Sequence, residues 1–305
     1  MPPQTVRVAG PTTAAPDQRC HLKTKAEVVR WSGPILLHLG ADLDPAFTHD
    51  RAKTFMVGSE EAEIMNVQNS VVVITGASMG IGAATARVFA QAGAKLVLAA
   101  RSVDKLAAVA QGLPPGAEPL IVHTDMTDQA QVNALMEQAA ARFGRIDILI
   151  NNAGQSAVGP VATIDPELYC QIIELNLFGP LYAIQAVVPR MKAHGGGVIV
   201  NISSGVSKMA IPGIGAYAST KYALNGLSLT ARNELAADNI RVVLFYPGQT
   251  ATDFGKNALR PDHLATWRPG GNQPAPAPDA PEDVAKKILE AVVTEPAEME
   301  MPRPR

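Results

Sequence analysis

The sequence is poor in the features that mark disulfide-rich, membrane or nucleic-acid-binding proteins. Its 305 residues include two cysteines, Cys20 and Cys170, which excludes a disulfide framework and is typical of a reducing compartment. The net charge of −2 lacks the basic excess that nucleic-acid binding normally requires. No apolar run reaches the ~18–20 residues of a membrane helix, and no charged N-terminal segment leads into an unbroken apolar one. We therefore expect a cytoplasmic protein without a nucleic-acid or membrane partner.

Residues 1–64 differ from the rest of the chain. Prolines, glycines and charges are scattered along them, and no strand or helix period is maintained. Met65 stands where a periodic pattern begins. We predict an irregular N-terminal extension over residues 1–64, either disordered or produced by a start site upstream of Met65, followed by one domain over residues 65–305. A targeting or oligomerisation arm is the alternative for the extension.

From Asn69 onward, short apolar runs alternate with longer amphipathic stretches. This alternation predicts an α/β fold, a doubly wound parallel sheet with helices on both faces, in which ligands bind beyond the carboxyl ends of the strands. The predicted strands are Val71–Thr75, Lys95–Ala100, Pro119–His123, Asp147–Asn151, Val198–Ser203 and Arg241–Tyr246. The predicted helices are Ile81–Ala92, Val103–Gln111, Gln129–Phe143, Pro166–Ala193, Tyr217–Ala237 and Pro281–Val293. Between the last strand and the last helix, the proline- and glycine-rich segment Asp253–Ala280 is predicted to be a functional loop.

Tyr217 and Lys221 lie four residues apart in the segment AYASTKYAL, and Ser204 precedes the tyrosine by thirteen residues. Positions four apart share one face of a helix, so the lysine ammonium can lie beside the phenol. A nearby cation favours phenolate and lowers the tyrosine pKa from ~10 toward the range of a useful acid or base. The Ser204 hydroxyl can hydrogen-bond a substrate oxygen. Chance spacing is the alternative, and the rest of the chain decides between them.

The glycine-rich segment TGASMGIG, from Thr75 to Gly82, follows the first predicted strand and opens the first helix. Gly76, Gly80 and Gly82 allow a tight turn and a close approach of the backbone to a ligand. The start of the helix then presents free N–H groups and a positive dipole end to a pyrophosphate. A glycine cluster alone is weak evidence, but at the first strand–helix junction it predicts dinucleotide binding.

Arg101 follows the second predicted strand, at the position where a carboxylate would bind the adenosine ribose of NAD. An arginine there suits a 2′-phosphate through a charge-assisted contact. We therefore predict that NADP(H) is favoured over NAD(H). A solvated surface arginine is the alternative.

Two further strand ends carry polar residues. Asp125 follows the third strand and is predicted to accept a hydrogen bond from the adenine amino group, whereas the helix cap beside it is assigned to Thr127 or Asp128. The segment NNAG, from Asn151 to Gly154, ends the fourth strand. Its asparagines can pin backbone across strand ends, and Gly154 leaves room for a cofactor.

With these segments in order, residues 67–301 resemble the short-chain dehydrogenase/reductase family of the compact single-domain type. The resemblance is carried by TGASMGIG, AAR, the strand end at Asp125, NNAG, ELNLFG, NISS, YASTK and YPGQTAT. It implies a Rossmann-like, NAD(P)-binding catalytic domain with a seven-stranded parallel sheet, whose seventh strand falls near Ala297–Pro302. No metal site is expected.

The resemblance also implies roles for individual residues. Tyr217 resembles the general acid/base, Lys221 the residue that lowers the tyrosine pKa and holds the nicotinamide ribose, and Ser204 the residue that polarises the carbonyl. Asn176, in ELNLFG, resembles the asparagine that positions a water beside Lys221, although taken alone it reads as a buried structural amide. The implied cofactor-binding residues are Gly76, Ser78, Gly80, Ile81, Gly82, Arg101, Asp125, Asn152, Ala153, Gly154, Tyr217, Lys221, Pro247, Gly248, Thr250 and Thr252.

The chain departs from the family pattern at two positions. Met79 stands where many NADP-preferring members carry a basic residue, so the NADP prediction depends mostly on Arg101. Thr220 precedes the lysine in YASTK where the motif is commonly written with serine, and no mechanistic cost is expected.

The expected reaction is hydride transfer between NADP(H) and a carbonyl or secondary alcohol. A pocket is predicted between Gln155–Val161, Gly205–Ile214 and the Asp253–Ala280 loop, with an apolar lining that favours a small or medium apolar ketone, aldehyde or alcohol. Lys208 is expected to be a loop surface residue. A 3-oxoacyl thioester, a steroid and a sugar stay open as substrates, and a non-catalytic NADP(H)-binding regulator or an epimerase is the rival function. The expected lining residues are Val158, Val206, Met209, Ile211, Ile214 and Phe254.

Members of this family usually assemble through two long helices, here near Pro166–Ala193 and Tyr217–Ala237. Small residues on the second helix (Ala218, Ser219, Ala223 and Gly226) permit close packing. A homodimer or homotetramer is therefore expected.

Overall fold

The computed structural model describes residues 67–260 and 277–302 of the chain. The predicted extension over residues 1–64 lies outside the described residues, as do residues 261–276 of the Asp253–Ala280 loop. All strands, helices and site residues discussed below belong to the described part.

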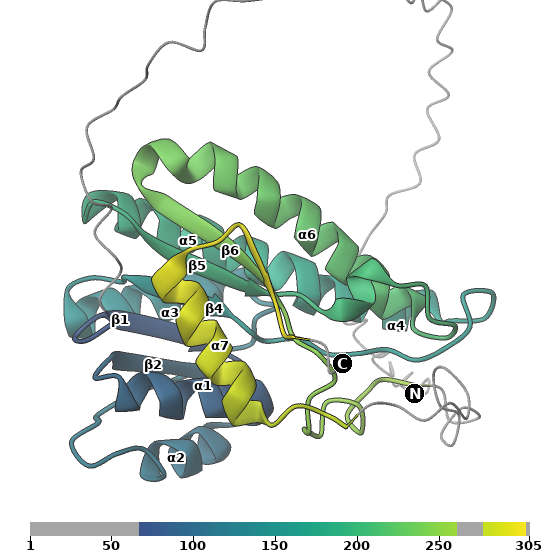
Figure 1. Ribbon diagram of the computed structural model, residues 1–305, viewed down its shortest axis with the longest axis horizontal. Helices are drawn as coiled ribbons and strands as arrows, with labels where there is room; N and C mark the ends of the chain where they lie inside the picture. Colours follow the sequence, from purple (N-terminus) through teal and green to yellow (C-terminus); the bar gives the residue numbers. More distant parts are fainter. Residues whose placement is uncertain (1–66, 261–276, 303–305) are drawn as a thin grey trace, which may run out of the picture. The chain divides into compact units, whose positions relative to one another are not determined.

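Within that part, seven parallel strands form one sheet in the order β3-β2-β1-β4-β5-β6-β7 (Figure 1). The chain builds the sheet outward from β1 to β3, returns to β4 and continues to β7, so the strand order reverses between β1 and β4. In such sheets the carboxyl ends beside this reversal form the ligand crevice. The strands are β1 (Val71–Thr75), β2 (Lys95–Ala100), β3 (Leu120–His123), β4 (Ile148–Asn151), β5 (Gly197–Ile202), β6 (Ile240–Tyr246) and β7 (Glu298–Glu300).

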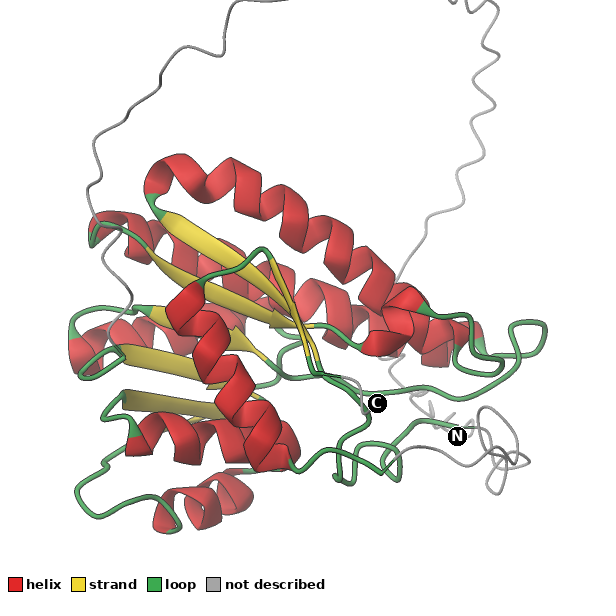
Figure 2. Ribbon diagram, viewed as in Figure 1, coloured by secondary structure: helices red, strands yellow, loops and turns green. Residues whose placement is uncertain are grey.

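Helices cover both faces of the sheet, so the predicted doubly wound architecture is confirmed (Figure 2). Helices α1, α2 and α7 pack on one face, and α3, α5 and α6 pack on the other. The α-helices are α1 (Gly80–Gln91), α2 (Val103–Gln111), α3 (Gln129–Phe143), α4 (Pro166–Ile173), α5 (Gly179–Ala193), α6 (Gly215–Leu235) and α7 (Pro281–Thr294). Three shorter turns complete the described elements: the π-helix η2 (Glu174–Phe178) and the 3-10 helices η3 (Gly205–Lys208) and η4 (Ala236–Asp238).

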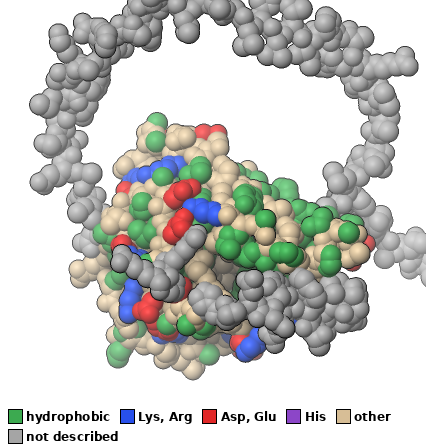
Figure 3. All heavy atoms as spheres, turned by 45° about the vertical axis from the view of Figure 1, so that its right-hand side comes forward, with side chains coloured by type: hydrophobic (Ala, Val, Ile, Leu, Met, Phe, Trp, Pro, Cys, Tyr) green, Lys and Arg blue, Asp and Glu red, His purple; other side chains and the backbone are tan. Residues whose placement is uncertain are grey.

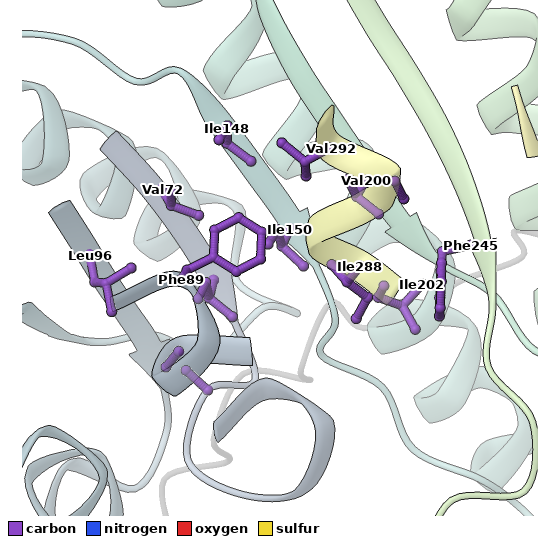
Figure 4. Close-up of a cluster of buried hydrophobic side chains, with 14 of the residues drawn as sticks. Val72, Phe89, Leu96, Ile148, Ile150, Val200, Ile202, Phe245, Ile288 and Val292 are labelled. Atoms are coloured by element: carbon purple, nitrogen blue, oxygen red, sulfur yellow. The ribbon is translucent and has the colours of Figure 1, made fainter. Parts of the chain in front are cut away.

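The core is divided by the sheet because side chains alternate along each strand. In β1, Val72 and Ile74 face α1 and α7, whereas Val71 and Val73 face the layer formed by α3 and α5. Figure 4 shows the first of these clusters, in which Phe89 of α1 is completely buried. Burying an apolar side chain of this size contributes about 1.5–3 kcal/mol relative to leaving it exposed. Strands buried on both faces explain why the sequence shows unbroken apolar runs.

The helix predicted over Pro166–Ala193 is interrupted. It consists of α4, the π-helical turn η2 and α5, and Asn176 is the buried residue of that turn. By length and mean hydropathy (1.4), this 28-residue unit is also the one helix among the described residues that satisfies the criteria for a membrane span. Core helices of globular proteins meet the same criteria, and Ala183, Val187 and Met191 of α5 are buried in the cluster against the sheet.

Candidate active site

The predicted catalytic residues come from two elements that meet at the carboxyl end of the sheet. Ser204 follows β5 and is the residue at the start of η3, where its hydroxyl accepts a hydrogen bond from the Val206 N–H. Tyr217 and Lys221 lie one turn apart on α6, and their exposed fractions are 7% and 4%. The side chains of Ser204 and Tyr217 lie close together, and the Ser204 hydroxyl opposes the rise in the pKa of Tyr217. The fold therefore brings together three residues that the sequence singled out by spacing alone.

The pKa of Tyr217 is raised in the structure, whereas the sequence predicted that Lys221 would lower it. Burial raises the pKa of Tyr217 to about 12, and the opposing effect of the Ser204 hydrogen bond is smaller. Burial also lowers the pKa of Lys221 to about 8. The ammonium donates a hydrogen bond to the Ile202 carbonyl (2.8 Å) and lies 6.0 Å from the centroid of the Tyr217 ring. Desolvation thus dominates the pKa of Tyr217, and the ammonium donates its hydrogen bond to a main-chain carbonyl rather than to the phenol.

These two shifts predict opposite effects of pH on stability. From pH 8 to 10.5 the folded protein has lost the Lys221 proton while the unfolded chain still holds it, so the free energy of unfolding rises with pH. Above pH 10 the unfolded chain loses the Tyr217 proton first, so stability falls toward pH 12. We expect Lys221→Met to remove the rising limb, which at about 1.36 kcal/mol per pKa unit is on the order of a few kcal/mol.

Urea denaturation at intervals from pH 7 to 10 measures this effect. Lys286→Met is the matched control, because the Lys286 side chain is 68% exposed on α7, and it should leave the pH profile unchanged. A Lys221→Met profile parallel to that of the parent would contradict the burial of a charged lysine.

Asn176 is held in place by both ends of its side-chain amide. Its oxygen accepts a hydrogen bond from the Gln155 N–H (2.9 Å), and its nitrogen donates to the Gln155 carbonyl (2.8 Å) and to the Thr220 hydroxyl (3.1 Å). A β-carbon added to Gly154 would lie 3.1 Å from the Asn176 oxygen and 3.6 Å from the Lys221 nitrogen. Asn176 and Lys221 therefore approach the same point beside Gly154. Thr220 holds the Asn176 side chain by a hydrogen bond, which its position in the motif did not reveal.

Ser203, the neighbour of Ser204, has a different task. Its hydroxyl donates a hydrogen bond to the Asn225 side chain (2.6 Å), and Asn225 in turn donates to Ser207 (3.0 Å). Ser207 donates to the Ser204 carbonyl (2.7 Å), which closes a polar network behind the site. The thirteen-residue spacing thus selects the serine that faces Tyr217.

The glycine loop forms a cradle that side chains would fill. Gly76 and Gly80 have φ angles of 65° and 55°, in the left-handed region that favours glycine. A β-carbon on Gly76 would lie 2.8 Å from the Ala153 α-carbon, and one on Gly82 would lie 2.6 Å from the Asn152 side chain. Glycine is therefore required at these two positions for the loop to pack against the residues after β4.

Residues after β4 pin the glycine loop. The Asn152 side chain donates hydrogen bonds to the carbonyls of Thr75 (3.0 Å) and Gly76 (3.2 Å), and the Ala153 N–H donates to the Thr75 hydroxyl (3.1 Å). Asn151, expected to act in the same way, instead donates to the Asn201 side chain of β5 (2.8 Å). Its side chain is hydrogen bonded to the neighbouring strand, so of the two asparagines only Asn152 holds the backbone of the glycine loop.

At the carboxyl end of the sheet, Arg101 immediately follows β2 and is exposed. It has no hydrogen bond or ion pair with any other described residue. One oxygen of Asp125 accepts hydrogen bonds from the N–H and hydroxyl of Thr127, and Asp128 is the residue that caps α3. The residues fit a dinucleotide here, since a free guanidinium and a partly engaged carboxylate line the ends of β2 and β3.

The segment after β6 lies against the glycine loop. Pro247 accepts a hydrogen bond from the Gly205 N–H (3.3 Å), and a β-carbon added to Gly80 would lie 3.2 Å from the Thr252 methyl group. A β-carbon added to Gly248 would contact the carboxylate of Asp279, which lies at the far end of the Asp253–Ala280 loop and was not singled out from the sequence. The other predicted cofactor residues are placed along the same edge: Ser78 and Ile81 in the glycine loop and at the start of α1, and Thr250 bridged to Asp279.

Comparisons with known proteins agree with this geometry. A family model described as short chain dehydrogenase matches residues 70–262. An uncharacterized oxidoreductase of Staphylococcus saprophyticus is 38% identical over 218 residues, which cover 66% of this chain and 88% of that protein.

Solved structures show the same fold with both kinds of nicotinamide cofactor. A short chain dehydrogenase/reductase from Burkholderia phymatum in complex with NAD is 27% identical, with a TM-score of 0.70 over 77% of this chain and 90% of its own. An alcohol dehydrogenase from the archaeon Thermococcus sibiricus, complexed with 5-hydroxy-NADP, is 30% identical, with a TM-score of 0.65 over 77% of this chain and 99% of its own.

Proposed function

The chain belongs to the short-chain dehydrogenase/reductase family of oxidoreductases, and on that premise we propose that it transfers a hydride between NADP(H) and a carbonyl or secondary alcohol. The observation that carries the proposal is that the Ser204 hydroxyl lies near the Tyr217 phenol, on the side of the sheet where the glycine cradle lies. Lys221 and Asn176 approach the same side of the site at Gly154.

The residues of the chain have separate tasks in the proposed reaction. The nicotinamide cofactor supplies or accepts the hydride when it is bound. In the reductive direction Tyr217 gives its proton to the substrate oxygen, and Ser204 holds that oxygen by a hydrogen bond. A pKa of about 12 keeps the phenol protonated at neutral pH, so the acid is available.

Lys221 and Asn176 assist the proton donor, one by supplying a proton and the other by holding the neighbouring backbone in place. With a pKa of about 8, Lys221 is mostly protonated at neutral pH and can resupply a proton. Both ends of the Asn176 amide are engaged with Gln155 and Thr220, so its side chain serves to hold the π-helical turn η2 in place. We propose that any water held beside Lys221 is bound by the main chain of this turn rather than by the amide.

The choice of NADP over NAD is proposed from Arg101 and tested there. Replacing Arg101 with glutamine should weaken NADPH binding by about 10- to 100-fold, since a hydrogen bond to a charged group contributes about 1.5–3 kcal/mol. NADH binding should change little, because NADH has no 2′-phosphate. Fluorescence titration with each cofactor gives the two dissociation constants.

Arg142→Gln is the matched control for this experiment, since the Arg142 side chain is 55% exposed near the C-terminus of α3, outside the cofactor cradle. Equal weakening of NADPH and NADH binding by Arg101→Gln would contradict the proposal, as would tighter binding of NADH than of NADPH by the parent protein.

The surroundings of the site support a neutral, apolar substrate. Val158, Ile214 and Ala258 form a buried cluster from three loops. Figure 3 shows hydrophobic side chains gathered toward the right-hand part of the visible face. Lys208 is not free to bind an anion, since it pairs with Glu300 and lies 3.9 Å from the centroid of the Tyr246 ring. A screen of NADPH oxidation across ketones, aldehydes, thioesters and sugars identifies the substrate class.

Exposed apolar residues also support the proposed homo-oligomer. Tyr222 and Leu229 on α6 and Phe178 beside α5 are large, apolar and partly exposed. Covering such residues with a second copy of the chain removes apolar surface from water.

A further inference from the structure

Phe254 is an exposed aromatic residue in contact with the proposed proton donor. Its ring centroid lies 5.6 Å from that of Tyr217, at an interplanar angle of 57°, and the residue is 39% exposed. Tilted aromatic pairs at this distance attract each other through their edges and faces. Phe254 therefore covers part of the Tyr217 ring while leaving apolar surface open to solvent.

The segment that carries Phe254 is held at both of its ends. We define the strap as residues 252–259. At its start, the Thr252 hydroxyl accepts a hydrogen bond from the Phe254 N–H (3.3 Å). At its end, Leu259 exchanges backbone hydrogen bonds with Ser156 and Val158, both 2.8 Å long. The position of Phe254 is thus set by contacts on either side of it.

A third set of contacts joins the middle of the strap to the loop after β4 and to the glycine loop. The Gln155 side chain donates a hydrogen bond to the Asn257 carbonyl (2.9 Å), and the Asn257 side chain lies 3.8 Å from the Met79 sulfur of the glycine loop. The strap therefore spans from the cofactor cradle to the loop after β4, and Phe254 lies where the two proposed ligands would meet.

Two lysines, one on the strap and one on a loop after β5, are already paired with carboxylates. Lys256 forms an ion pair with Asp253 (2.7 Å) within the strap. Lys208, on the neighbouring loop, is neutralised by Glu300 and lies 3.9 Å from Glu298. The nearby side chains Val206 and Ile211 are apolar and pack on the cluster of Val158, Ile214 and Ala258. Lys256 and Lys208 are thus engaged with carboxylates, whereas an apolar ring would find apolar neighbours.

We propose that Phe254 is a specificity-determining residue that packs on a ring of the substrate and holds it against the hydroxyls of Tyr217 and Ser204. The substrate class is a ketone, or the matching secondary alcohol, with an aromatic or alicyclic ring next to the reacting carbon. This inference rests on the proposed function. A ring in the substrate can add to the tilted pair of Phe254 and Tyr217, and it excludes water from the phenol.

Kinetics with two ketones test the proposal. Acetophenone carries a ring next to the carbonyl, and 2-butanone does not. Phe254→Ala should lower kcat/KM for acetophenone by about tenfold or more, with a much smaller loss for 2-butanone. Phe254→Leu, which keeps an apolar side chain, should lie between Phe254→Ala and the parent. Equal losses with both ketones would overturn the proposal.

Phe178→Ala is the matched control, because Phe178 is also a phenylalanine on the surface, 40% exposed, and it contacts Tyr182 rather than the site. Its kinetic constants should equal those of the parent. A similar loss of acetophenone selectivity in Phe178→Ala would show that the selectivity does not depend specifically on Phe254.

Binding without turnover separates this inference from the proposed function. Saturation-transfer NMR measures the affinity of 1-phenylethanol and of 2-butanol for the NADPH-loaded protein, in which neither alcohol can react. The parent should prefer 1-phenylethanol, and Phe254→Ala should lose that preference. If the parent reduces no carbonyl compound, the proposed function fails, but the binding preference still decides on Phe254. No preference in the parent would overturn the inference.

Discussion

Tyr217→Phe is expected to lower turnover by about 10²- to 10⁴-fold, the contribution of a positioned acid or base. The substitution removes one oxygen atom and leaves the ring, which is buried beneath Phe254, in place. Ser204 keeps its own hydroxyl but loses its partner, so the substrate oxygen can still be bound without a proton donor. Cofactor affinity should stay within about twofold of the parent, since the cradle is formed by other residues.

Steady-state kinetics and fluorescence titration of NADPH measure these two quantities. Tyr222→Phe is the matched control: Tyr222 lies on the same helix, is 51% exposed and should be replaced without effect on turnover. A Tyr217→Phe protein that turns over within twofold of the parent would remove Tyr217 from the mechanism.

Gly82→Ala is expected to raise the dissociation constant of the cofactor by about tenfold or more and to destabilise the fold by about 1–3 kcal/mol. The added methyl group would clash with the Gly76 carbonyl and would lie 2.6 Å from the Asn152 side chain. Asn152 pins the glycine loop through that same side chain, so the loop has to move to admit the methyl group. Cofactor affinity and the stability of the fold should therefore both decrease.

Gly226→Ala is expected to have the opposite effect on stability from Gly82→Ala. Gly226 is in the interior of α6, and nothing lies within 4 Å of a β-carbon built there. Alanine favours helix over glycine by about 1 kcal/mol, so this variant should be slightly more stable than the parent. Urea denaturation and cofactor titration of both variants give the comparison. A Gly82→Ala protein with parental affinity would show that the loop does not approach the cofactor closely.

Much of the fold followed from short-range patterns. Apolar runs such as Val71–Thr75 predicted the strands, because strands buried on both faces consist mostly of apolar residues. The thirteen-residue spacing selected Ser204 over Ser203, and the structure places Ser204 against Tyr217 while Ser203 donates to Asn225. The predicted seventh strand near Ala297–Pro302 is β7, Glu298–Glu300.

Other features had no local signal. The π-helical turn at Asn176 interrupts a continuous helical pattern, and it is held by Gln155 and Thr220, which lie 21 and 44 positions away. Lys208 is exposed, as expected for a loop surface residue, but its pairing with Glu300, 92 positions away on β7, had no local signal. Contacts between residues so far apart depend on how the strands are ordered, and no periodicity records that order.

The amino-acid order alone was sufficient for the strand–helix alternation, the glycine loop and the placing of Tyr217 and Lys221 on one helical face, since these follow from the periods of the backbone. Tertiary packing determined the pKa values of Tyr217 and Lys221. Burial raises the pKa of Tyr217 and lowers that of Lys221, opposite to the lowering of the Tyr217 pKa expected from a neighbouring cation. The contact of Phe254 with Tyr217 likewise required the folded chain, because both desolvation and long-range contact arise only when distant segments pack together.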